Sequence, residues 1–217
     1  MQLTKVKTSI DAPWNRGWIR CLCLLILLLW PHPKIILCYG VIFRALGNAT
    51  FYRSNSDAVV RFCELSPKPK EASSFDTEIW IADARNVAPD GGAMTRVVCL
   101  ESRAIGWIPT ALTLALVGSL SIPWRRRCVA LGLSLLLIHV FVLFSLTVCI
   151  AHQINVDQSL GWTHLGPTFS FALYAAYETL ITHFGAGLVA AIIVWVCICA
   201  ALHRSSLQWF YPQRASL

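Results

Sequence analysis

The chain has 217 residues, of which 56% are hydrophobic and only 13% are charged, and its formal net charge at pH 7 is +7. Soluble globular domains carry about 25% charged residues, so about half of the usual charge is missing. This composition excludes a disordered chain, which needs low hydrophobicity and high charge, and it argues strongly against a water-soluble enzyme.

The distribution of apolar residues predicts a membrane protein of the all-α class with four transmembrane helices. A membrane-spanning helix needs about 20 mainly apolar residues, within a range of about 17 to 25. Four stretches meet this requirement: 18–43, 104–122, 128–151 and 185–202. The pieces outside these spans are 1–17, 44–103, 123–127, 152–184 and 203–217.

The first predicted span is broken at residues 31–34, because Pro31 and Pro33 lack amide donors and clash with the preceding turn. His32 and Lys34 in this break are candidate functional groups, since ionisable residues within a span bind headgroups or partner carboxylates. The alternative is that Lys34 extends to the interface. A cleaved signal peptide is a rival interpretation of this region, but the small residues at 45–47 lie well beyond the apolar run.

The charges predict the orientation of the spans. With the N-terminus in the cytoplasm, the inner pieces together with Arg20 at the start of the first span hold nine basic residues and one acidic residue, whereas the outer pieces hold eight basic and ten acidic residues. Cytoplasmic loops carry the excess of Lys and Arg, so both ends are expected inside. Arg125, Arg126 and Arg127 are the strongest anchor and are expected to contact anionic lipid headgroups. Nucleic-acid binding is not expected, because the basic residues are spread over short pieces that flank the spans.

Residues 44–103 are predicted to form a small β-rich extracytoplasmic domain. Short alternating runs at 58–65, 77–83 and 96–100 are typical of half-buried strands, and turn signals lie at 67–70 and 89–92. Cys63 and Cys99 lie in the first and third runs, which we expect to be neighbouring strands, and in an oxidising compartment they would form a disulfide bond. The alternative is two free thiols.

Other polar residues give weaker signals. His139, in the third span, is expected to pair with a hydroxyl on a neighbouring helix, such as Thr110 or Thr113. The histidines, Asp157 and Glu178 in 152–184 match no metal-site spacing, so we predict no metal and no cofactor. The stretch 167–184 is either an interfacial helix or an extension of the fourth span. No nucleophile motif is present, so we predict no catalytic residues.

The residues from Ser102 to Leu116, the segment Ile122-Pro-Trp-Arg-Arg-Arg127 and the residues 130–133 suggest a family. This stretch resembles small exosortase-associated membrane proteins of Gram-negative bacteria, and the likeness covers mainly residues 102–133. The resemblance implies an inner-membrane accessory protein of a transpeptidase-like protein-sorting system, with an exosortase-like enzyme as its partner. It supplies no catalytic residues.

These observations lead to one expectation and one alternative. We expect a non-catalytic accessory protein, multi-pass in the cell inner membrane, that contacts lipids and a membrane-protein partner. Arg103, Trp107 and Pro109 are expected to form a partner-facing or structural motif at the start of the second span. The alternative is a membrane enzyme acting at the outer leaflet, by thiol-redox chemistry or lipid-linked transfer.

Overall fold

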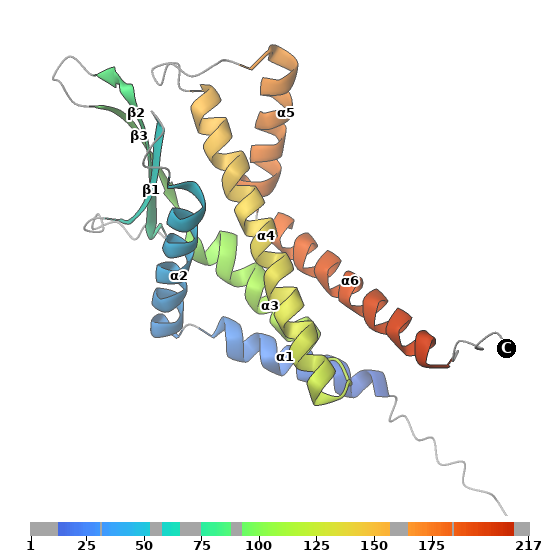
Figure 1. Cartoon of the computed structure of the whole chain (residues 1–217). Coiled ribbons are helices and arrows are strands. Elements are labelled where there is room, and N and C mark those ends of the chain that lie inside the picture. The colour runs from blue at the N-terminus through green and yellow to red at the C-terminus, as the bar shows by residue number, and fades with distance from the viewer. Residues whose placement is uncertain are drawn as a thin grey trace, which may run out of the picture.

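A computed structural model describes residues 13–30, 32–52, 58–65, 75–87, 93–156, 165–183 and 185–210 (Figure 1). Most of the described chain is helical, and one small three-stranded sheet lies at one end of the helices. The elements, in chain order, are α1 (Pro13–Leu29), α2 (Pro33–Phe51), β1 (Ala58–Glu64), β2 (Thr77–Val87), β3 (Ala93–Leu100), the π-helix η1 (Arg103–Trp107), α3 (Ile108–Gly118), α4 (Trp124–Val156), α5 (Pro167–Tyr177), the π-helix η3 (Glu178–Thr182) and α6 (Gly185–Phe210). The predicted turns at 67–70 and 89–92 lie outside the described residues.

Three helices of the described chain are long and apolar enough to cross a membrane, namely 34–51, 124–156 and 185–202. Two further apolar helices, 18–29 and 103–118, are shorter. The predicted first span is therefore two helices, because the Pro-His-Pro sequence at 31–33 ends α1 and α2 begins afresh at Pro33. The helix α2 also continues to Phe51, eight residues beyond the predicted end of that span.

The segment 167–184 does not extend α6. The helix α5 and η3 end at Thr182, where His183 has an extended backbone, and α6 begins at Gly185. The helix α5 packs along α4 instead, and Asn155 donates a hydrogen bond of 3.1 Å to the Ser170 hydroxyl. This segment is therefore a separate helix.

The helix α3 lies at the centre of the other helices and contacts α1, α4 and α6. Its inward positions are mostly small, and Ala111, Thr113 and Ala115 are completely buried. Small side chains let helix backbones approach closely, which is how helices associate where no water drives them together. Gly187 of α6 shows this, because a Cβ atom at that position would lie 2.5 Å from Cγ of Pro109.

The sheet is antiparallel in the order β1-β2-β3, and one of its faces covers the helices. Along β2, Thr77, Ile79 and Ile81 are fully buried, whereas Trp80 on the opposite face is 44% exposed. The buried face packs into a core with Phe43 of α2 and with Val142, Leu146 and Cys149 of α4. This alternation is the one that the sequence predicts for a half-buried strand.

The predicted Cys63–Cys99 disulfide does not form in this structure, in which both thiols are free. Both residues lie opposite Glu78, on the two strands that flank β2. Two interstrand spacings of about 4.8 Å therefore separate them, whereas a disulfide requires Cα atoms within about 7 Å. The prediction treated the first and third strands as neighbours, but β2 lies between them.

The end of α2 is joined to the edge of the sheet by a paired hydrogen bond. Asn48 donates from Nδ2 to the Phe62 carbonyl at 2.9 Å and accepts from the Phe62 amide at 2.8 Å. The Phe62 side chain is 3% exposed and packs against Phe43 and Phe51. A Cβ atom on Gly47 would lie 2.7 to 2.8 Å from the Phe62 ring, so this glycine permits the contact.

We expect Gly47→Ala to destabilise the protein by about 1–3 kcal/mol, because the ring of Phe62 has to move out of a packed core. Gly132→Ala is the matched control, since that glycine lies in α4 with nothing within 4 Å of its would-be Cβ atom. Both changes gain about 1 kcal/mol of helix propensity. Thermal unfolding in detergent should therefore show a lower Tm for the first variant only, and equal values would contradict the packing argument.

Candidate functional site

A polar pocket lies where α2, the sheet and η1 meet. This junction pocket has a volume of 270 Å³ and is lined by Gly40, Arg44, Glu64, Asp76, Glu101 and Arg103, with apolar residues around them. Three acidic and two basic side chains in so small a pocket are unusual in a chain with so little charge.

The Asp76 carboxylate fastens the sheet to the helices. It accepts hydrogen bonds from the Ser102 amide at 2.8 Å, from the Ser102 hydroxyl and from the Thr77 hydroxyl at 3.2 Å. Ser102 is fully buried at the start of η1. Because charge-assisted hydrogen bonds are about twice as strong as neutral ones, Asp76 fixes the position of η1 below β2. Its oxygens are consequently occupied.

Arg44 of α2 completes the wall opposite Asp76. Its guanidinium lies 3.4 Å from the Glu64 carboxylate and donates to the Asp76 carbonyl at 3.5 Å. The Glu64 side chain is 75% exposed, so this ion pair stabilises the fold little. The pair does, however, leave Arg103 and Glu101 as the charged groups of the pocket that have no side-chain partner among the described residues.

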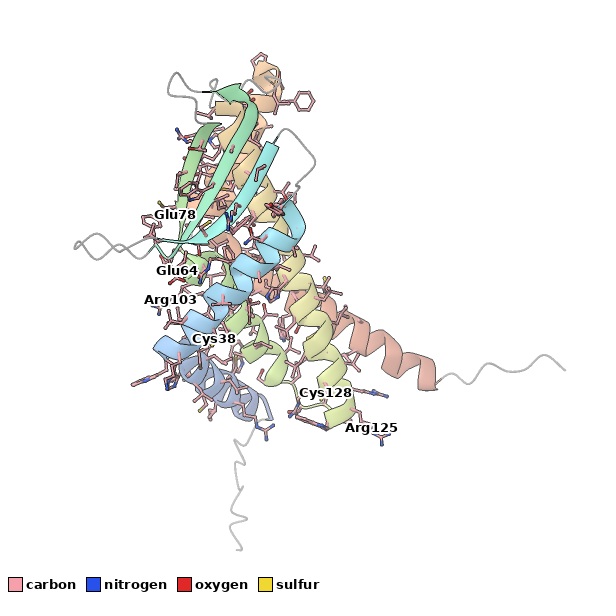
Figure 2. All side chains as sticks on the ribbon, turned by 60° about the vertical axis from the view of Figure 1, so that its left-hand side comes forward. Cys38, Glu64, Glu78, Arg103, Arg125 and Cys128 are labelled. Carbon is pink, nitrogen blue, oxygen red and sulfur yellow. The ribbon has the colours of Figure 1, made fainter. Side chains whose placement is uncertain are left out.

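The predicted motif of Arg103, Trp107 and Pro109 separates into two parts. Trp107 packs on the Tyr39 ring with centroids 5.5 Å apart, and Pro109 is buried against Gly187, so both are structural. Arg103 instead lines the junction pocket, and within the described chain its buried Nε atom has no hydrogen-bond partner. Figure 2 shows Arg103 below the sheet, on the same side as Glu64 and Glu78.

A second pocket of 420 Å³ lies beside the first and shares Glu101 with it. We call it the thiol pocket, because Cys99 and His183 both line it, together with Ser145 and Tyr177. The Nδ1 atom of His183 lies 2.7 Å from the Glu178 carbonyl. Sequence reasoning did not bring Cys99 and His183 together, because they are far apart in the chain and match no local motif.

The aromatic wall of this region includes a stacked pair that the sequence did not reveal. The rings of His152 and Tyr177 are 4.3 Å apart, and Tyr174 lies 5.8 Å from His152. Burial raises the pKa of the Tyr177 phenol, and a hydrogen bond to Glu178 raises the pKa of Tyr174. Both phenols are therefore neutral at physiological pH.

The three predicted intramembrane polar residues have no common site. His32 and Lys34 lie exposed at the start of α2, so Lys34 is not within an unbroken helix. The prediction that His139 pairs with Thr110 or Thr113 is wrong. Its Nδ1 lies 2.8 Å from the Leu135 carbonyl of its own helix, whereas the two hydroxyls donate to the carbonyls of Gly106 and Pro109.

The three arginines after α3 are not equivalent. Arg125 and Arg126 are exposed, but Arg127 is partly buried and donates to the carbonyls of Leu120 at 2.9 Å and Ile122 at 3.3 Å. Arg127 therefore closes the loop after α3, where the helix C-terminus leaves carbonyls unpaired. Within the part of the chain that the structure describes, no group of three or more His, Cys, Asp or Glu residues is placed to hold a metal ion.

Comparisons with family models, with curated proteins and with solved structures found no match for this chain. The interpretation of both pockets therefore rests on their chemistry alone.

We expect Asp76→Ala to loosen the sheet from the helices, because it leaves the buried Ser102 amide and hydroxyl without an acceptor. A loss of about 1–3 kcal/mol is typical for unsatisfied buried groups. Hydrogen exchange at the backbone amides of β2 and η1 should quicken by at least tenfold. Glu78→Gln is the control, since the Glu78 side chain accepts a hydrogen bond from the exposed indole of Trp80 and from no other group of the described residues, and equal effects of both changes would contradict the role of Asp76 in holding the sheet.

Proposed function

We propose that this chain is a multi-pass protein of the cell inner membrane with four crossing segments. In this arrangement α1 and α2 together make the first crossing, and η1–α3, α4 and α6 make the other three. The sheet then lies outside the cytoplasm, and both ends lie inside. Support comes from α4, whose 33 residues are about 50 Å long, enough to separate the two polar ends across a bilayer.

The charge distribution supports the orientation. Arg125 and Cys128 lie at the end of α4 that is far from the sheet, whereas Glu64, Glu78 and Arg103 lie at the sheet end (Figure 2). A run of three basic residues with no acidic neighbour favours the cytoplasmic side. The mixed charges around the sheet favour the outer side.

Labelling of two natural cysteines tests this orientation. Cys99 and Cys128 are both exposed, one at the sheet and one beside the arginines. We expect a membrane-impermeant maleimide to modify Cys99 in intact spheroplasts and to modify Cys128 only after permeabilisation, as read by peptide mass spectrometry. Modification of Cys128 in intact spheroplasts at the rate of Cys99 would overturn the proposed orientation.

We further propose that the protein acts as a non-catalytic accessory subunit that binds a membrane-protein partner through the junction pocket. The observation that carries this proposal is the Arg103 guanidinium, which lines the junction pocket and has no hydrogen-bond or ion-pair partner within the described chain. An unpaired buried donor is costly, so an acceptor supplied by a partner would stabilise the complex strongly. The resemblance at residues 102–133 suggests an exosortase-like transpeptidase as this partner.

We expect Arg103→Gln to reduce partner recovery from native membranes by at least tenfold, because a charge-assisted hydrogen bond is lost. Arg61→Gln is the matched control, since Arg61 is an exposed arginine on the outer face of the sheet. Recovery is measured by crosslinking in membranes followed by quantitative mass spectrometry. Unchanged recovery with Arg103→Gln, in a variant that keeps its Tm, would contradict the proposal.

A membrane enzyme that uses a thiol is the second candidate, and the presence of Cys99 and His183 in the lining of one pocket favours it. A histidine beside a cysteine activates the thiol as a nucleophile. The labelling experiment above separates the two functions. An enzyme requires the modification of Cys99 to slow markedly in His183→Gln, whereas an accessory protein shows the same rate in both chains.

A further inference from the structure

A crevice lies between the beginning of α4 and the distal part of α6, at the end of the molecule opposite the sheet. Its volume is 470 Å³, and it is separate from both pockets near the sheet. Arg125 and Arg126 lie at its edge, and its walls are aliphatic. Those walls are formed mainly by Val129, Leu133, Ile198 and Leu202. We call this feature the arginine crevice.

The two arginines at the crevice have no internal partners. Both are exposed, and within the described chain neither side chain makes a hydrogen bond or an ion pair. The sequence has no Asp or Glu in residues 108–156 or 185–210, so the helices that form the crevice supply no counter-charge. Arg127 differs, because its guanidinium is bonded to the loop carbonyls. Two neighbouring cations are thus available to an external anion.

The positive charge and the apolar walls of the arginine crevice together indicate which kind of anion fits it. A free phosphate would be held by the arginines but would leave the aliphatic walls uncovered. A zwitterionic lipid would cover the walls but would bring a cation next to the two guanidinium groups. An anionic phospholipid satisfies both requirements, since arginines bind phosphate oxygens in bidentate geometry and an acyl chain covers apolar surface.

We propose that the arginine crevice is a binding site for one anionic phospholipid, with its phosphate at Arg125 and Arg126 and an acyl chain between α4 and α6. The site rests on the membrane placement proposed above. The site lies beside the buried cluster in which Ala130 of α4 packs with Ile198 of α6, where α6 begins to diverge from the other helices (Figure 1). The bound lipid is therefore a structural component of that end of the bundle.

The headgroup half of the site is tested with the purified full-length chain in non-ionic detergent, by native mass spectrometry against phosphatidylglycerol and phosphatidylethanolamine with identical acyl chains. We expect phosphatidylglycerol to bind at least tenfold more tightly. In the double variant Arg125→Gln/Arg126→Gln the affinity for phosphatidylglycerol should fall about tenfold or more. The double variant Arg125→Lys/Arg126→Lys keeps both charges and should retain most of the affinity. Arg20→Gln is the control, since Arg20 is exposed in α1 and lies outside the crevice. Equal losses in control and double variant would overturn the proposal.

The acyl-chain half is tested with a pair of adjacent alanines in α6. Ala201 lines the crevice and Ala200 does not, although both are exposed. Ala201→Phe should fill the crevice and weaken phosphatidylglycerol binding at least fivefold, whereas Ala200→Phe should not, and glycerol phosphate should not compete. Equal effects of the two substitutions, or competition by glycerol phosphate, would overturn the lipid assignment. Release of the wild-type chain from membranes by carbonate would instead contradict the membrane placement itself.

Discussion

The structure depends on the attachment of a small sheet to the helices, which cover the face that the sheet cannot bury by itself. Three strands are too few to bury both faces, and the inner face of β2 is covered only because α2 and α4 lie against it. The attachment is fixed at two ends. Asn48 pairs with the backbone of Phe62 on one side, and Asp76 holds Ser102 on the other. Both pockets near the sheet exist because these contacts set the distance between the strands and η1.

Polar side chains within the helices mostly satisfy their own backbone. Thr110, Thr113, Ser145 and His139 each bond a carbonyl four residues earlier. Such bonds satisfy the polar atoms within each helix, although the Thr110 hydroxyl also pairs with Tyr39 of α2. The helices are held mainly by the fit of small and large side chains, as between Gly187 and Pro109, and the pockets described above lie at the two ends of the bundle.

The sequence predicted the local features of this fold well and its long-range features poorly. The alternation around Ile79 and Ile81 correctly indicated a strand with one buried face, because the period of two is a local property. The prolines at 31 and 33 correctly indicated a break, although not that two separate helices result. The order of the strands is not a local property, so the prediction that the strands of Cys63 and Cys99 are neighbours was wrong. The junction pocket was not predicted, because Asp76 and Ser102 are 26 residues apart and no motif relates them. Likewise, three identical arginines gave no sign that Arg127 alone turns inward.

The short central helix has a consequence for the surrounding lipid. From Arg103 to Gly118, η1 and α3 contain 16 residues and are about 24 Å long, which is less than the roughly 30 Å of a hydrocarbon core. The neighbours of α3 shield it, because α1, α4 and α6 surround it and none of its residues is exposed. In a bilayer the membrane thickness would therefore be matched by the longer helices at the perimeter, such as α4. The ends of α3 would then lie below the membrane surface, enclosed by the bundle.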